Sequence, residues 1–383
     1  MRLLRSERFP AVLLLAAAAA GLVVANSPLG AGAIGLQQVR LGVPGTPFDL
    51  SLGHWISDGL LAVFFFAVAV ELRHELTEGE LRSARRALLP AIAAAGGVAV
   101  PIAIYLAITA GTDVLGGWPI PTATDIAFAL GVLAVFGAGL PPALRAFLLA
   151  LAILDDLVGI VFIAVLFGTG VDLGLLAAAL VAVAGFAAAS RLLGGARATV
   201  AIIAMIVLAA TAWALVLASG VHATIAGVLL GIAVAPSPGG RIRHGVQPWV
   251  NAAVLPLFAL SAALVPFPDV RPAELSPAFW GVLVALPAGK LVGIAGAGWL
   301  GQLLLHAPGT PRLAVGDLVA VGALGGIGFT VSLLLAQLAL RGDSELVDQA
   351  TLAVLAGSAV SLAASAGVVS ARARHHRRMQ VES

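Results

Sequence analysis

The chain of 383 residues contains no cysteine, which excludes disulfide bonds and thiol chemistry. Charged residues are also scarce: they form 10% of the chain, against about 25% in a soluble domain. Hydrophobic residues make up 60% of the chain. This balance excludes an ordinary soluble domain and indicates an all-α polytopic membrane protein, in which residues 1–383 form a single helical bundle.

The positive charge is almost entirely arginine, because Lys290 is the only lysine. The arginines lie in short segments between apolar runs, and the formal net charge is only +2. This distribution indicates membrane topology and argues against nucleic-acid binding.

Apolar runs of roughly 17–25 residues predict membrane-spanning helices. Some connections between the runs are very short, so eleven or thirteen spans remain as alternatives to twelve. The twelve predicted spans are 9–25, 55–73, 87–109, 119–138, 143–167, 173–192, 199–217, 221–235, 249–266, 277–304, 313–340 and 346–370.

The arginines divide unevenly when alternate connections are assigned to opposite sides of the membrane. Three of them, Arg40, Arg271 and Arg341, fall on the side away from the termini, and the other 17 share a side with both termini. Positive residues stay in the cytoplasm, so both termini are predicted to be cytoplasmic, with a basic tail at 371–383. The first span also resembles a secretory signal peptide, and its cleavage is the alternative to a retained helix.

The segment 150–159 carries two adjacent carboxylates, Asp155 and Asp156, inside a long apolar run. A carboxylate at bilayer depth costs roughly 2.5–3.5 kcal/mol on insertion scales, unless a cation or proton neutralises it. Successive helical residues point about 100° apart, so the two carboxylates are expected to face different surroundings. One is expected to meet a fixed positive partner and the other to line a cavity open to ions; a structural pair at a helix end is the alternative.

The fourth span has an irregular beginning. Pro119 and Pro121 lack backbone donors and disturb the start of the helix. Thr124 adds a hydroxyl, and Asp125 is a third carboxylate within the membrane.

The eleventh span has a corresponding break at Gly325, Gly326 and Gly328. Each glycine weakens a helix by about 1 kcal/mol, and unwound backbone survives in a membrane only where protein or a cavity surrounds it. Close helix packing through small residues is the alternative explanation. Two interrupted spans in corresponding halves favour a midplane ion site between inverted repeats.

Two further polar residues lie within predicted spans. Lys290 is placed in the middle of the tenth span, where one of the buried aspartates is its expected partner. His222 lies at the outer end of the eighth span and is expected either to make a structural hydrogen bond or to relay protons.

Two segments beside the spans carry weaker signals. Residues 39–52 contain two short alternating stretches around Pro44-Gly45, which predict a β-hairpin, with an irregular loop as the alternative. Residues 71–75 form a mixed charge cluster at the end of the second span. This cluster is either a solvated helix end or the mouth of an ion pathway.

Six motifs in this order resemble the NhaA family of bacterial sodium/proton antiporters, and the resemblance covers about residues 9–370. The matching stretches are Leu61-Ala-Val-Phe-Phe65 with Glu71, Thr124-Asp-Ile-Ala-Phe-Ala-Leu-Gly131, Ala150 to Asp156, Ser219 to Gly227, Gly289-Lys290 and Gly325-Gly-Ile-Gly-Phe-Thr330.

The resemblance implies a role for each site residue. Asp156 would be the principal carboxylate for Na⁺ and protons, and Asp155 would pair with Lys290 or share the protons. Thr124 and Asp125 would lie where two discontinuous helices, spans 4 and 11, cross at the midplane. Asp125 and Lys290 would there offset the opposed half-helix dipoles. The hairpin at 39–52 would help to form a homodimer in the bacterial inner membrane.

The region that the family uses for pH sensing departs from its pattern here. His74 stands where an arginine is common, and Arg243 where well-studied members have a sensing glutamate. Leu260 to Ala263 also replaces a more polar Asn-Ala-Gly run. The pH set-point is therefore not predicted, and the candidate sensors are Glu71, Arg73, His74, Glu75, His222 and His244.

The sequence thus predicts a secondary active transporter, not an enzyme, that exports Na⁺ or Li⁺ in exchange for protons without a cofactor. Such exchange would be electrogenic and would serve pH and sodium homeostasis. An intramembrane aspartyl protease is one alternative, although Ala314 breaks its Gly-x-Gly-Asp signature at Asp317. A passive cation channel is the other alternative, and it would show no coupling to protons.

Overall fold

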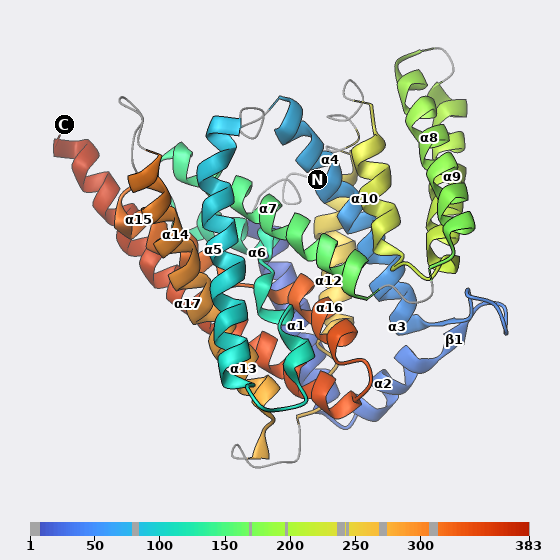
Figure 1. Cartoon of the computed structure of the whole chain (residues 1–383), viewed down its shortest axis with the longest axis horizontal. Helices are drawn as coiled ribbons and strands as arrows, with labels where there is room; N and C mark the ends of the chain where they lie inside the picture. Colours follow the sequence, from blue (N-terminus) through green and yellow to red (C-terminus); the bar gives the residue numbers. More distant parts are fainter. Residues whose placement is uncertain are drawn as a thin grey trace. The chain divides into compact units, whose positions relative to one another are not determined.

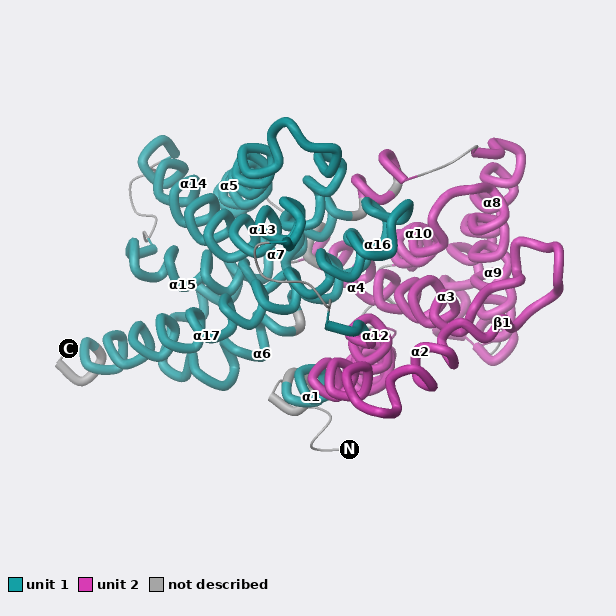
Figure 2. Tube along the Cα trace, turned by 90° about the horizontal axis from the view of Figure 1, so that it is seen from below, with its two compact units in different colours: residues 1–16, 80–159, 265–383 teal, residues 17–79, 160–264 magenta. Residues whose placement is uncertain are grey.

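The computed structural model describes residues 8–78, 84–167, 171–195, 198–235, 242, 245–267, 274–305 and 313–382, and these are almost entirely helical (Figure 1). They divide into two compact units, which Figure 2 distinguishes by colour. Unit 1 comprises residues 1–16, 80–159 and 265–383, and unit 2 comprises residues 17–79 and 160–264. The prediction of one domain over 1–383 stays a prediction.

The α-helices are α1 (Arg8–Ala25), α2 (Gly30–Gln38), α3 (Leu52–His54), α4 (Leu61–Thr77), α5 (Ala84–Ile108), α6 (Ile126–Phe136), α7 (Pro142–Leu166), α8 (Leu173–Ser190), α9 (Ala198–Ala218), α10 (Thr224–Ala233), α12 (Leu255–Ala262), α13 (Pro277–Val284), α14 (Lys290–Leu304), α15 (Val315–Gly325), α16 (Phe329–Ala339) and α17 (Ser344–Glu382). Wider π-helical turns are η2 (Trp55–Leu60), η7 (Val250–Val254) and η9 (Ala285–Gly289). Tighter 3₁₀ turns are η4 (Leu115–Gly117), η5 (Ile120–Thr122) and η6 (Arg191–Gly194).

Among the described residues, eight helices are long and apolar enough to cross a membrane, or up to ten if each bent helix pair forms one span. The chain is therefore a multi-pass helical membrane protein, whereas the count of twelve stays a prediction. Two of the predicted spans contain only short helices, because 119–138 holds the 11-residue α6 and 221–235 holds the 10-residue α10.

Unit 1 is built around the long helix α5, which packs closely against α14. Glycines make this close approach possible: a Cβ at Gly293 would overlap the carbonyl oxygen of Gly96, and one at Gly96 would overlap Ala297. Small residues allow membrane helices to approach backbone to backbone. This contact fixes α14, and thereby places Lys290, the first residue of α14, inside unit 1.

Unit 2 contains two closely packed helix pairs, α4 with α10 and α8 with α9 (Figure 2). A core that includes Val70, Phe186, Met205 and Leu230 joins them. The unit also holds a pocket of about 750 Å³ with an almost wholly apolar lining. None of the carboxylates predicted to bind cations lines this pocket, because all of them belong to unit 1.

The predicted hairpin within 39–52 is confirmed. Strands β1 (Arg40–Leu41) and β2 (Leu50–Ser51) pair antiparallel, with Arg40 opposite Ser51 and Leu41 opposite Leu50. Gly45 in the connection has φ of 78°, a left-handed conformation that favours glycine.

The glycine contact between α5 and α14 yields a prediction about stability. Gly293→Leu should lower the free energy of unfolding by about 1–3 kcal/mol or more, because overpacking displaces the two backbones. Gly296→Leu is the matched control on the same helix, since a Cβ there has no neighbour within 4 Å. Thermal unfolding of the detergent-purified variants measures the difference, and equal melting temperatures would contradict this account of the packing.

Candidate ion-binding site

Two chain interruptions lie within unit 1. The first separates the 3₁₀ turn η5, which ends at Thr122, from α6, which begins at Ile126. The second separates α15, which ends at Gly325, from α16, which begins at Phe329, and the two helices are bent by 49°. Each interruption leaves helix ends whose backbone groups need partners.

Asp125 connects the two interruptions. Its backbone N–H donates to the carbonyl oxygen of Ile327 over 2.6 Å. Its Oδ1 accepts from the N–H of Phe128 (3.1 Å), and its Oδ2 accepts from the N–H and the hydroxyl of Thr330 (3.2 and 2.7 Å). One buried carboxylate therefore lies at the first turns of both α6 and α16, where helix dipoles favour negative charge.

Thr124 links the same region to α7. Its hydroxyl lies 2.7 Å from Oδ2 of Asp155 and 2.8 Å from the carbonyl oxygen of Gly325. A hydroxyl has one proton, so Thr124 donates to one of these acceptors at a time or shares the proton between them. Thr124 has no exposed surface, and Asp155 is 1% exposed, so water does not compete for these bonds.

Lys290 pairs with Asp155. Its Nζ contacts Oδ2 of Asp155 as both an ion pair and a hydrogen bond, and neither side chain is exposed. A buried charge without a partner is very costly, so removal of either group would leave the other in an unfavourable state.

Asp156 is in a different position, although it is the next residue of α7. It is also buried, yet neither of its carboxylate oxygens has a hydrogen-bond partner among the described residues. Oδ1 of Asp155, the carboxylate oxygen that does not contact Lys290, likewise has no hydrogen-bond partner among the described residues. Buried carboxylate oxygens without donors require a proton or a cation, so this arrangement can exchange one for the other.

Within the described part of the chain, no group of three or more His, Asp or Glu residues converges to hold a metal ion. A cation at Asp156 would therefore need oxygen ligands of other kinds. Unwound backbone carbonyls and helix C-termini supply such ligands in membrane transporters. The hydroxyl of Thr124, which contacts Asp155, and the carbonyl of Gly325, which contacts that hydroxyl, are candidate oxygens of this kind.

The glycines of the second interruption also serve close packing. A Cβ at Gly326 would lie 2.6 Å from Oγ of Ser361 on α17, and one at Gly328 would lie 3.1 Å from the carbonyl oxygen of Ala123. Helix interruption and packing through small residues, which were alternative explanations for these glycines, therefore occur together.

The six residues considered for pH sensing all belong to unit 2. The side chain of Arg73 donates to the carbonyl oxygen of Ile232, and Nδ1 of His74 lies 3.6 Å from Oε2 of Glu78. Glu71 has polar interactions as well. His244 and the side chain of Glu75 lie outside the described residues.

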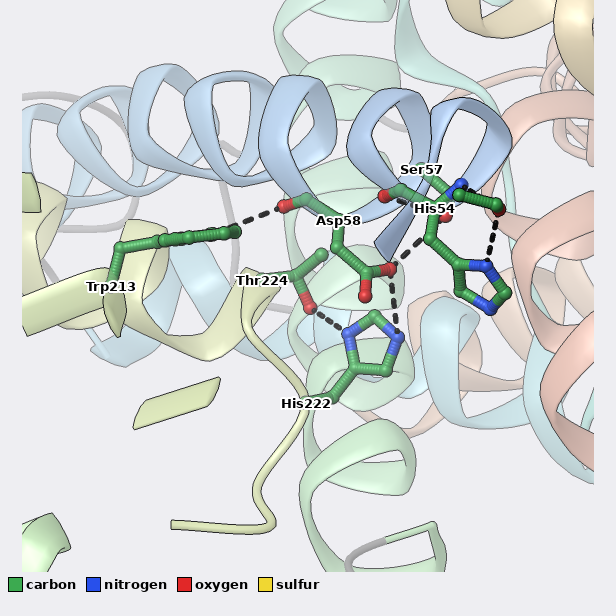
Figure 3. A network of polar contacts seen from close by, with 7 residues as sticks. His54, Ser57, Asp58, Trp213, His222 and Thr224 are labelled. Carbon is green, nitrogen blue, oxygen red and sulfur yellow. Dashed lines mark hydrogen bonds and ion pairs between the residues drawn. The ribbon is translucent and has the colours of Figure 1, made fainter. Parts of the chain in front are cut away.

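His222 belongs to a polar network that joins α10 to the turn before α4 (Figure 3). Its ring lies between Thr224, 2.9 Å from Nδ1, and Asp58, 3.6 Å from Nε2. Asp58 also accepts from the hydroxyl of Ser57, and its backbone carbonyl accepts from the indole of Trp213. His222 therefore has specific partners that fit the structural role, which is one of the two roles predicted for it.

Sequence reasoning missed Thr330, whose N–H and hydroxyl donate to Asp125. The signal available was its position directly after the glycine-rich break. At the proline break, the hydroxyl of Thr122 donates to the carbonyl of Pro119, and the N–H of Asp125 donates to the carbonyl of Ile327.

Comparison with known proteins identifies the family. The model of the family described as Na⁺/H⁺ antiporter 1 matches residues 1–369. The chain belongs to this family. It is 57% identical over 380 residues to Na⁺/H⁺ antiporter NhaA 2 of Clavibacter michiganensis subsp. michiganensis, covering 98% of this chain and 93% of that protein.

Two other antiporters of the family are similar over most of their length. Na⁺/H⁺ antiporter NhaA of Tropheryma whipplei (strain Twist) is 44% identical over 368 residues, which cover 94% of this chain and 93% of that protein. Na⁺/H⁺ antiporter NhaA 1 of a Nocardioides species is 43% identical over 392 residues, with coverage of 98% and 89%. The resemblance to the NhaA family is thus confirmed over nearly the whole chain.

The hydroxyl of Thr124 offers a direct test of this geometry. Thr124→Val keeps the shape but removes the bond to Asp155, so it should weaken Na⁺ binding by about tenfold, the worth of one hydrogen bond to a charged group. Thr124→Ser should restore most of the affinity. The half-saturating Na⁺ concentration in proteoliposomes measures both, and wild-type affinity in Thr124→Val would contradict the role of this hydroxyl.

Proposed function

We propose that this member of the Na⁺/H⁺ antiporter 1 family exports Na⁺, or Li⁺, in exchange for protons. The family membership and the antiporter relatives support the reaction. The observation that carries the proposal for the site is the contrast between two adjacent aspartates. Asp155 forms an ion pair with Lys290, whereas the carboxylate of Asp156 has no hydrogen-bond partner among the described residues.

Exchange follows from competition at Asp156. A bound cation and a bound proton each neutralise the carboxylate, so one must leave before the other binds. Alternating access then carries whichever is bound across the membrane. Asp155 is the second carboxylate of the site. Because it can release Lys290 and take up a proton, two protons can be carried for one sodium ion, and the cycle is electrogenic.

Asp125 has a supporting role in this proposal. Its carboxylate compensates the positive ends of α6 and α16, and Lys290 supplies the opposing positive charge near the site. Spans 4 and 11 are then discontinuous transmembrane helices that cross at the midplane of inverted repeats. The bend between α15 and α16 and the bond from Asp125 to Ile327 support this arrangement.

The surroundings of the transporter are inferred from the sequence and the family. Twelve spans place both termini in the cytoplasm, as the distribution of arginines favours. The bacterial inner membrane is the proposed location, and the hairpin of β1 and β2 is the proposed contact of a homodimer. The segment from Glu71 to Glu75, with His222 and His244, contains the proposed pH sensors.

The alternative of an intramembrane aspartyl protease lacks support from Asp317. A protease needs two aspartates that share a substrate, but the carboxylate of Asp317 is bound by Arg372 and His376. An assay of proton coupling distinguishes the exchanger from a passive cation channel. Addition of Na⁺ to vesicles changes the internal pH only if cation movement is coupled to protons.

The carboxylate without a partner is the first test of the proposal. Asp156→Asn keeps the shape of the side chain but removes its charge, and should abolish Na⁺-driven proton movement in everted vesicles. The protein should remain folded, because the change removes a buried charge without breaking a bond to another residue. Normal exchange by the Asp156→Asn variant would contradict the assignment of Asp156 as the carboxylate that binds Na⁺ and protons.

Lys290 gives the second test, because arginine stays charged at any accessible pH. Lys290→Arg should keep both Na⁺ binding and the charge moved per cycle, if the lysine is a structural cation for Asp155. Current on a supported membrane, compared with the Na⁺ flux, measures that ratio. A loss of current while exchange continues would instead make Lys290 a proton carrier.

A further inference from the structure

A buried acidic residue at the start of α15 joins that helix to the end of the chain. Asp317 lies in the first turn of α15, and its side chain is only 4% exposed. Its Oδ1 accepts from Nε of Arg372 over 3.0 Å. Nε2 of His376 lies 3.0 and 3.2 Å from the two carboxylate oxygens. One carboxylate thus holds two basic side chains of α17.

These contacts occur where α17 packs tightly on α15. Val369 and Ala373, one turn apart on α17, have no exposed surface. A Cβ at Gly316 would lie 2.9 Å from both Cδ and Nε of Arg372, so the arginine lies directly over the backbone of α15. Arg372 is therefore fixed by packing on one side and by Asp317 on the other.

The opposite end of α15 reaches the candidate site. The helix has 11 residues and is about 16 Å long, and it ends at Gly325, whose carbonyl accepts from Thr124. A shift of α15 along α17 would therefore move this carbonyl relative to Thr124 and Asp155.

We propose that Asp317, Arg372 and His376 form a tie that fixes the position of α15 along α17 and so places the Gly325 carbonyl at the cation site. Asp317 is a positioning residue, since it acts through α15 and does not contact the ion. The inference rests on the cation site proposed above.

The other charged side chains that the structure describes close to this tie in sequence are basic. α15 packs against α14, α17 and α6. Apart from Asp317, the charged side chains of these helices that lie near the tie in sequence are Arg374, His375, Arg377 and Arg378 of α17, and α6 carries none. The ring of His375 lies 5.9 Å from that of His376, and Arg377 packs on Gly139.

The experiment compares Asp317→Asn, Arg372→Gln and the double variant with Arg374→Gln, which removes an exposed charge from the same helix. Proteoliposomes with the full chain give the half-saturating Na⁺ concentration and the maximal rate of exchange. Each single variant should raise the half-saturating concentration by about three- to tenfold, which is part of the roughly 10- to 150-fold that corresponds to one charged hydrogen bond, because the tie acts on the site only through α15. The double variant should be no worse than the worse single variant, because the two residues share one contact.

Two further results complete the test. Arg372→Lys should recover part of the affinity, and Arg374→Gln should match the wild type. If Asp317→Asn fails to fold, Arg372→Gln and Arg372→Lys decide the question against Arg374→Gln.

The proposal is overturned if Arg372→Gln has the same Na⁺ affinity as Arg374→Gln, or if the effects of Asp317→Asn and Arg372→Gln add in the double variant. Failure of the exchange function itself is a separate result. A wild type that moves no protons on addition of Na⁺ refutes the proposed function, whereas exchange with unchanged variants refutes the tie alone.

Discussion

The ion pair between Lys290 and Asp155 is the interaction on which the site depends. Both groups are fully buried, and each would be a costly isolated charge without the other. The pair fixes α14 against α7, and its geometry turns Asp155 toward Lys290 and Thr124. The carboxylate of the next residue of α7, Asp156, has no donor among the described residues. In the proposed mechanism, the ion pair of Asp155 thus leaves the carboxylate of Asp156 available for an exchangeable ion.

A second constraint is the unwound backbone beside this pair. Helix ends within a membrane need partners for their N–H and carbonyl groups. Asp125 satisfies several of them at once, since it bonds Ile327, Phe128 and Thr330. The carbonyl of Gly325 is satisfied by Thr124, which also reaches Asp155. The hydrogen bonds that stabilise the breaks are therefore the same ones that connect the residues of the proposed ion site.

The sequence predicted most members of this site for a simple reason. Charged side chains within apolar runs are too costly to be incidental, so Asp125, Asp155, Asp156 and Lys290 are recognisable without a structure. Residue reasoning alone left open which aspartate meets the lysine, because adjacent helical residues differ by about 100° and the rotation of α7 depends on packing. The family resemblance implied that Asp155 would pair with Lys290 or share the protons, and the structure pairs it with Lys290.

Other features required the structure. Thr330 was missed because hydroxyl residues in helices commonly bond their own backbone, so a hydroxyl alone is a weak signal. The partners of Asp317 could not be found either, since 55 and 59 residues separate it from Arg372 and His376. By length and composition, the described residues contain eight to ten candidate spans. The helices α6 and α10 are too short to count as spans by this criterion.

The central claim is that Na⁺ and protons compete for the same buried carboxylates. The most direct measurement is proton release when Na⁺ is added to the detergent-purified protein in weakly buffered solution, followed with a pH indicator at several starting pH values. The account predicts release of protons on Na⁺ binding, and a half-saturating Na⁺ concentration that rises as the pH falls. Binding of Na⁺ without proton release, with an affinity independent of pH, would contradict it.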